Sequence, residues 1–88
     1  MNRFIVVSNH KSEDCTRAIK ETIAIGYLTH YDWGCKDGVH TGWAILEADD
    51  KAEAMMSVPT FLRAQAQVVQ LTKFDPERFD AGHRKTSS

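Results

Sequence analysis

The chain carries almost no excess charge of either sign. Its 88 residues contain 11 lysines and arginines against 12 aspartates and glutamates, which gives a formal net charge of −1. Nucleic acids and anionic lipid surfaces attract proteins that have a surplus of positive charge. We therefore expect neither nucleic acid nor a membrane among its partners.

Long apolar runs and numerous cysteines are missing too. The longest early apolar run, residues 4–7, is too short for a signal peptide, and a composition of 42% hydrophobic and 26% charged residues is neither disordered nor membrane-spanning. We expect a soluble cytoplasmic protein. The two cysteines, Cys15 and Cys35, are too few for a disulfide scaffold, and both are expected to be reduced. Stability must then come from packing.

The length leaves room for one domain, because independent cores usually need on the order of 100 residues. We expect an α+β domain over residues 1–75 and, over residues 76–88, a short helical turn and a frayed tail. A chain of this size buries only a little above roughly 60% of its unfolded surface, so its stability margin is thin unless a partner covers more.

The first half predicts a strand, a helix and a hairpin. Residues 2–9 are β-branched and aromatic in the middle, which favours a central strand buried on both sides. Residues 13–25 have a helical apolar stripe, with Ser12 as the N-cap and Gly26 as the stop. Residues 28–36 and 39–48 flank Asp37-Gly38, typical of a two-residue hairpin turn, which sets the cross-strand pairs Cys35–His40, Gly34–Thr41, Trp33–Gly42, Asp32–Trp43 and Tyr31–Ala44.

The second half predicts a short helix and a last strand. Asp49 or Asp50 can cap the helix in a capping-box pattern with Glu53, and Pro59 ends it. Its expected buried stripe is Ala52, Met55 and Met56. Residues 60–65 predict a turn or a single helical turn that holds Phe61 and Leu62 against the core, and residues 66–74 predict the final strand.

This order, βαββαβ, predicts the ferredoxin-like arrangement, a four-stranded antiparallel sheet with both helices on one face. The other face stays uncovered, yet Trp43 and Ile45, or else Trp33 and Leu46, must point there. Isologous dimers are the commonest assembly of small proteins. We therefore predict a homodimer that packs sheet face against sheet face.

The stretch GWAILEADDKAEAMMSVPTFLRAQAQVVQL joins a strand ending in Glu-Ala-Asp, a short helix, a Val-Pro-x-Phe break and a final strand. This layout resembles the second half of muconolactone-isomerase-like proteins in the dimeric α+β barrel superfamily, which also includes antibiotic-biosynthesis-type monooxygenases and small nickel-binding proteins. The likeness covers residues 4–74. It implies the ferredoxin-like fold and the dimer; no catalytic position of that isomerase can be matched.

One face of the predicted hairpin carries residues suited to a small-molecule pocket. His30 and Asp32 stand two apart, so on a strand they share a face, and the carboxylate would orient the imidazole for acid/base work. We hypothesise cofactor-independent proton transfer on a small carbonyl or lactone compound, with His30 as base. Thr41, Trp43, Tyr31 and Trp33 are the expected ligand-binding residues. Over proton transfer we favour the interpretation that His30 and Asp32 are an inert pair at the rim of the dimer.

Cys35 and His40, with His10 at the end of the first strand, form an alternative metal-binding set. No CxxC, HxH or HExxH pattern accompanies them, so we favour an ordinary cross-strand pair. Cys15 lies on the apolar stripe of its helix, which favours a buried structural thiol over a reactive one. The alternative to an enzyme is thus a non-catalytic dimer with a metal-binding, regulatory or structural role.

Overall fold

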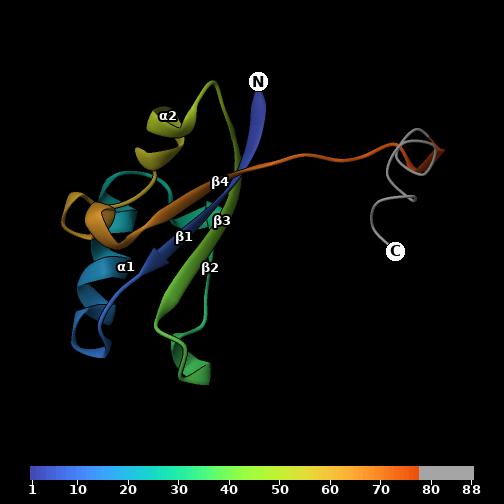
Figure 1. Ribbon diagram of the computed structural model, residues 1–88. Coiled ribbons are helices and arrows are strands. Elements are labelled where there is room, and N and C mark those ends of the chain that lie inside the picture. The colour runs from blue at the N-terminus through green and yellow to red at the C-terminus, as the bar shows by residue number, and fades with distance from the viewer. Residues whose placement is uncertain (78–88) are drawn as a thin grey trace.

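A computed structural model of the protein describes residues 1–77, which form one four-stranded antiparallel sheet with helices packed on one side (Figure 1). The fold class is α+β, compatible with a ferredoxin-like arrangement. In chain order the elements are β1 (Asn2–Asn9), the 3-10 helix η1 (Ser12–Asp14), α1 (Cys15–Ala24), η2 (Leu28–His30), β2 (Tyr31–Trp33), η3 (Cys35–Asp37), β3 (Thr41–Ala48), α2 (Lys51–Met55), η4 (Thr60–Gln65) and β4 (Gln67–Leu71).

The sheet order β2-β3-β1-β4 places β1 in the interior, as the sequence predicts. Its residues alternate: Phe4 and Val6 are fully buried beneath the helices, whereas Ile5 on the opposite face is only partly buried. The expectation that β1 is buried on both sides is therefore wrong for a single chain. No helix within residues 1–77 covers that second face.

The two-residue hairpin is also wrong. The pairs Tyr31–Ala44, Asp32–Trp43 and Trp33–Gly42 form as predicted, but β2 ends at Trp33 and β3 begins at Thr41. The amide of Val39 donates to the carbonyl of Gly34, so residues 34–40 curl into η3 instead of extending the ladder. Gly38, at φ 80°, supplies the left-handed residue that ends η3. Cys35 and His40 consequently lie in a loop.

The first helix starts later than expected. Ser12 begins a 3-10 turn rather than capping an α-helix, and the residue before α1 is Asp14, whose side chain makes no capping hydrogen bond. The buried residues of α1 are Ala18 and Thr22, whereas Ile23 is 53% exposed, so the predicted stripe is narrower than the sequence suggests. The helix ends at Ala24, and Gly26, at φ 85°, is the left-handed residue that stops it, as predicted.

The second helix begins as predicted, since the amide of Glu53 donates to Asp50 Oδ1 at 2.8 Å and Glu53 Oε1 accepts from the Asp49 amide at 2.9 Å. Its predicted stripe is only partly correct: Met55 packs partly buried against the core, but Ala52 and Met56 are exposed, and the segment buries Ala54, Ser57 and Val58 as well. Because α2 spans only Lys51–Met55, residues after its end reach the core. The 3-10 helix η4 buries Leu62 and partly buries Phe61, as expected.

The core is small. Within residues 1–77, nine buried hydrophobic residues form it, four of them alanines: Phe4, Val6, Ala18, Tyr31, Ala44, Ala48, Ala54, Val58 and Leu62. After β4, which is shorter than predicted, the chain runs away from the sheet to a turn in which the Glu77 amide donates to Asp75 Oδ1. The predicted tail lies outside the described residues. Residues 1–77 contain no helix with the length and apolar character needed to span a bilayer.

Candidate metal centre

Four metal-ligating side chains meet at one end of the sheet. His10 follows β1, Cys15 opens α1, Cys35 opens η3, and His40 lies just before β3. Both connections that carry them lie at the lower end of the molecule in Figure 1.

The sheet register brings the two histidines together. Strands β1 and β3 run antiparallel, and their last paired residues at this end are Asn9 and Thr41. His10 and His40 are the next residues outward, and the His10 amide donates to the His40 carbonyl at 3.1 Å. Thr41 Oγ1 also donates to Asn9 Oδ1 at 3.0 Å, which fixes this corner of the sheet.

The ligand atoms of His10, Cys15, Cys35 and His40 all lie within 4.8 Å of one another. Within the cluster, His10 Nε2 and Cys35 Sγ are 3.3 Å apart. Bond lengths to zinc imply ligand–ligand separations of roughly 3.3 to 3.8 Å in a tetrahedron of two sulfurs and two nitrogens. The four atoms are thus near enough to close around one ion through small side-chain rotations.

Two of the imidazole nitrogens have unmet hydrogen-bonding capacity. Among the residues that the structure describes, four buried side-chain polar atoms lack a hydrogen bond of standard geometry: Ser8 Oγ, His10 Nδ1, Trp33 Nε1 and His40 Nδ1. Buried polar atoms are normally paired, because an unpaired one costs about 1 to 3 kcal/mol. Such atoms concentrate here beside two free thiols.

The local environment disfavours charge on His10 and on Cys35. Burial lowers the pKa of His10, and the neighbouring His40 lowers it further, while the backbone of Ser8 and the carboxylate of Asp14 act in the opposite sense. A neutral imidazole has the lone pair that a metal needs. Burial, together with the adjacent Cys15 thiol, raises the pKa of Cys35 to about 11.

An aromatic wall separates the cluster from the rest of the core. The ring of Trp33 lies 5.9 Å from that of His10 and stacks on Tyr31 at 5.3 Å. Gly42 makes this possible, since a Cβ there would lie 2.8 Å from the Trp33 ring. The Tyr31 hydroxyl contacts Ser57 Oγ at 3.3 Å, and burial raises the Tyr31 pKa.

The sequence predicts His10, Cys35 and His40 as an alternative metal set and places Cys15 on the apolar stripe of its helix. The structure places Cys15 at the start of α1, facing the other three. A signal was present in the spacing: His-x4-Cys at residues 10–15 mirrors Cys-x4-His at residues 35–40. Only the strand register, however, shows that the two halves meet.

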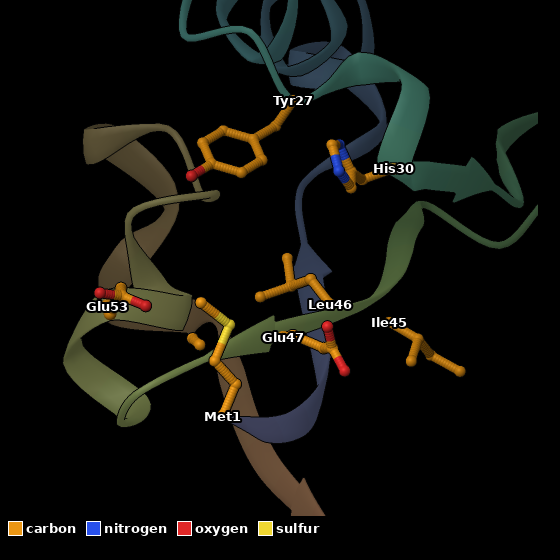
Figure 2. Close-up of a pocket in the computed structure, with 8 residues that line it drawn as sticks. Met1, Tyr27, His30, Ile45, Leu46, Glu47 and Glu53 are labelled. Atoms are coloured by element: carbon orange, nitrogen blue, oxygen red, sulfur yellow. The ribbon is translucent and has the colours of Figure 1, made fainter.

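The other polar site that the sequence indicated has a different arrangement. His30 ends η2, rather than standing on a strand, and lines an open pocket of about 640 Å³ beside β3. Tyr27 and His30 face this pocket from one side, and Met1 and Glu53 lie on the other side (Figure 2). The rings of Tyr27 and His30 are 5.5 Å apart.

The predicted partner of His30 lies elsewhere. Asp32 is exposed on β2 and is not among the residues lining the pocket, and within residues 1–77 no hydrogen bond or ion pair joins it to His30. The expected ligand-binding residues are also dispersed. Trp43 lies on the uncovered face with its ring over Gly34, Tyr31 and Trp33 belong to the covered face, and Thr41 is buried beside Asn9.

Comparison with known proteins identifies no relative: the chain matches no family model, no curated protein and no solved structure.

Proposed function

We propose that this protein binds a transition metal ion, Zn²⁺ by preference, through His10, Cys15, Cys35 and His40. The observation that carries the proposal is the meeting of these four ligand atoms within 4.8 Å, from segments separated by up to 30 residues in the sequence. A set of two thiolates and two imidazoles around one point is typical of zinc.

The donor atoms decide which metals suit the site. Magnesium and calcium prefer carboxylate, carbonyl and water oxygens, none of which belongs to the four-residue set. Thiolate and imidazole ligands select zinc and its neighbours, and four of them favour a tetrahedral ion. The lowered pKa of His10 supports the proposal, because a ligating imidazole must be neutral near pH 7.

Four protein ligands favour a structural centre over a catalytic one, since catalytic zinc normally keeps one position for water or substrate. The ion would join the β1–α1 connection to the β2–β3 loop. That link is valuable in a domain whose core, over the residues that the structure describes, has four alanines among nine buried hydrophobic residues. Small domains commonly use a metal in place of a larger core.

For the assembly, the best-supported proposal is a ferredoxin-like protomer that pairs with a second copy through its uncovered sheet face. Ile45 and Val69 are 58% and 46% exposed on that face, and Ile5 and Trp43 beside them are only partly buried. A second copy would remove this apolar surface from water, at roughly 25 cal/mol per Å². In a twofold-symmetric dimer, this apolar patch on one copy would pack against the same patch on the other.

A second candidate function is the binding of a small organic molecule in the pocket beside β3. Its volume of about 640 Å³ and its mixed lining of Tyr27, His30, Leu46 and Glu47 support this. Proton transfer by His30 remains a prediction. Orientation of His30 by Asp32 has no contact to support it within the described residues.

The test of metal binding uses untagged protein with elemental analysis and zinc titration. We expect one zinc per chain, and Co²⁺ in its place should give the intense absorption bands of a tetrahedral thiolate complex. The His40→Ala variant should lose tight binding. His30→Ala is the matched control, because His30 lies outside the cluster and should leave zinc binding unchanged. Wild-type protein that takes up no metal would end the proposal.

A further inference from the structure

The two cysteines of the cluster form a close and accessible pair. Cys15 and Cys35 are both free thiols and both partly exposed, and their sulfurs lie within 4.8 Å of each other. A disulfide requires sulfurs about 2.0 Å apart, so the gap to be closed is at most about 2.8 Å.

The segments that carry the pair can supply this movement. Cys35 opens the short 3-10 helix η3 in an exposed loop, with Lys36, Asp37 and Gly38 after it all exposed. Cys15 is the first residue of α1, where a χ1 rotation does not require the helix to unfold. Neither thiol is sealed in the core.

We propose that Cys15 and Cys35 are a peroxide-oxidised dithiol whose disulfide expels the metal ion. The release step rests on the proposed zinc site. One thiolate attacks a peroxide oxygen and becomes a sulfenic acid, with cleavage of the O–O bond and release of one water after protonation. The second thiolate attacks the sulfenic sulfur, forms the S–S bond and displaces the hydroxyl group, which leaves as a second water after protonation.

Both sulfur ligands are consumed in this step. The balance is two thiolates, one hydrogen peroxide and two protons giving one disulfide and two waters, so zinc itself changes no oxidation state. Only His10 and His40 then remain from the four-residue set, and a disulfide sulfur is a poor zinc ligand because the thiolate is the ligating form. Oxidation by peroxide thus releases zinc and removes the link that the ion makes between the β1–α1 connection and the β2–β3 loop.

The experiment treats zinc-loaded protein with hydrogen peroxide and follows three quantities together: zinc released to a chromophoric chelator, free thiols, and intact mass. We expect one zinc released per chain, loss of both thiols, a mass lower by two hydrogens, and a Cys15–Cys35 peptide after digestion. Dithiothreitol should restore both thiols and zinc uptake. Zinc retained after both thiols are lost would overturn the proposal, as would oxidation to separate sulfinic acids without a crosslink.

Two variants and the metal-free protein separate this proposal from the zinc site. Cys15→Ser should form no intramolecular disulfide. His40→Ala removes one metal ligand but keeps both sulfurs, so it should bind zinc poorly and still form the disulfide. Metal-free wild-type protein should crosslink as well. If the wild type takes up no zinc but crosslinks, only metal binding fails; if it binds zinc but never crosslinks, only the dithiol fails.

Discussion

The two polar ends of this molecule differ in how sequence distance relates to spatial distance. At the end with the proposed metal site, His10 and His40 lie 30 residues apart in the chain, and the antiparallel register of β1 and β3 brings them together. At the pocket end, His30 and Asp32 are only two residues apart in the sequence. Their side chains nevertheless lie on different surfaces, because the 3-10 helix η2 ends at His30 and β2 begins at the next residue. Proximity in sequence was the weaker guide.

The difference has a physical cause. A side chain's direction follows the local backbone, and the period-2 alternation that would align His30 with Asp32 holds only inside a strand. Register, by contrast, is fixed by many ladder hydrogen bonds together, so it places distant residues reliably. The two ends should therefore respond differently to substitution.

The largest expected effect is on metal affinity at the cluster. Replacement of Cys35 by serine should weaken zinc binding by more than about 100-fold, since changes to groups that only orient ligands already cost up to roughly that much. Competition with a chelator of known affinity measures this. His30→Ala, at the other end, should leave the affinity unchanged, and an equal loss in both variants would abolish the distinction between the two ends.

Zinc should also raise thermal stability. At a free zinc concentration 1,000 times the dissociation constant, binding adds about 4 kcal/mol to the free energy of unfolding. For a domain of this size that corresponds to an increase in Tm of about 15 to 30 °C. Calorimetry with zinc and then with excess chelator measures this increase. A Tm that is the same with and without chelator would argue against a metal that stabilises the fold.

The next effect belongs to the uncovered sheet face, which adjoins the pocket. Ile45→Lys should dissociate the proposed dimer, because it places a charge in an apolar interface. Ile23→Lys on α1 is a matched control, since Ile23 is 53% exposed and Ile45 58%, but Ile23 lies away from that face. Sedimentation velocity measures the assembly. A wild type that sediments as a monomer at micromolar concentration would refute the dimer itself.

Much of the fold could be predicted from the sequence. The central strand, the Gly26 stop and the Asp50 cap follow from local patterns that the structure keeps, and the β2–β3 pairs keep the predicted register although the predicted turn does not form. The loop over residues 34–40 could not be predicted, because Asp37-Gly38 suits a two-residue turn as well as the end of a 3-10 helix.

That loop also bears on the site. The β1–β3 register brings His10 and His40 together, and the loop over residues 34–40 adds Cys35 to the cluster. The buried stripe of α1 was also not predictable in full. The small core leaves Ile23 without a surface to pack against in a single chain, so the stripe is narrower than expected. The sequence therefore shows which residues could ligate a metal, but it does not show that these residues come together in the fold.

A moderate effect is expected where the aromatic wall meets the cluster. A Cβ on Gly42 would lie 2.8 Å from the Trp33 ring and 3.0 Å from Tyr31, so Gly42→Ala should cost about 1 to 3 kcal/mol of stability. Because Trp33 packs beside His10, zinc affinity should fall as well. Gly26→Ala strains only a helix end at positive φ. Chemical denaturation and zinc titration of both variants measure the two effects. Equal zinc affinities in Gly42→Ala and Gly26→Ala would show that packing of Trp33 does not affect the metal site.

The smallest effect is on the alkaline stability of metal-free protein. The pKa of Cys35 is raised to about 11 from 9.0, so the folded state keeps its thiol proton where the unfolded state loses it. This contribution is complete below pH 9 and is lost as the pH rises towards 11. The Tm of the wild type should therefore fall more over that range than the Tm of Cys35→Ser, and parallel curves would contradict the assignment.

X-ray absorption at the zinc edge of the loaded protein tests the central claim most directly. The account predicts one zinc per chain, with two sulfur ligands at about 2.3 Å and two imidazole nitrogens at about 2.0 to 2.1 Å. A shell made only of nitrogen and oxygen would contradict it, because Cys15 and Cys35 would then take no part in holding the ion.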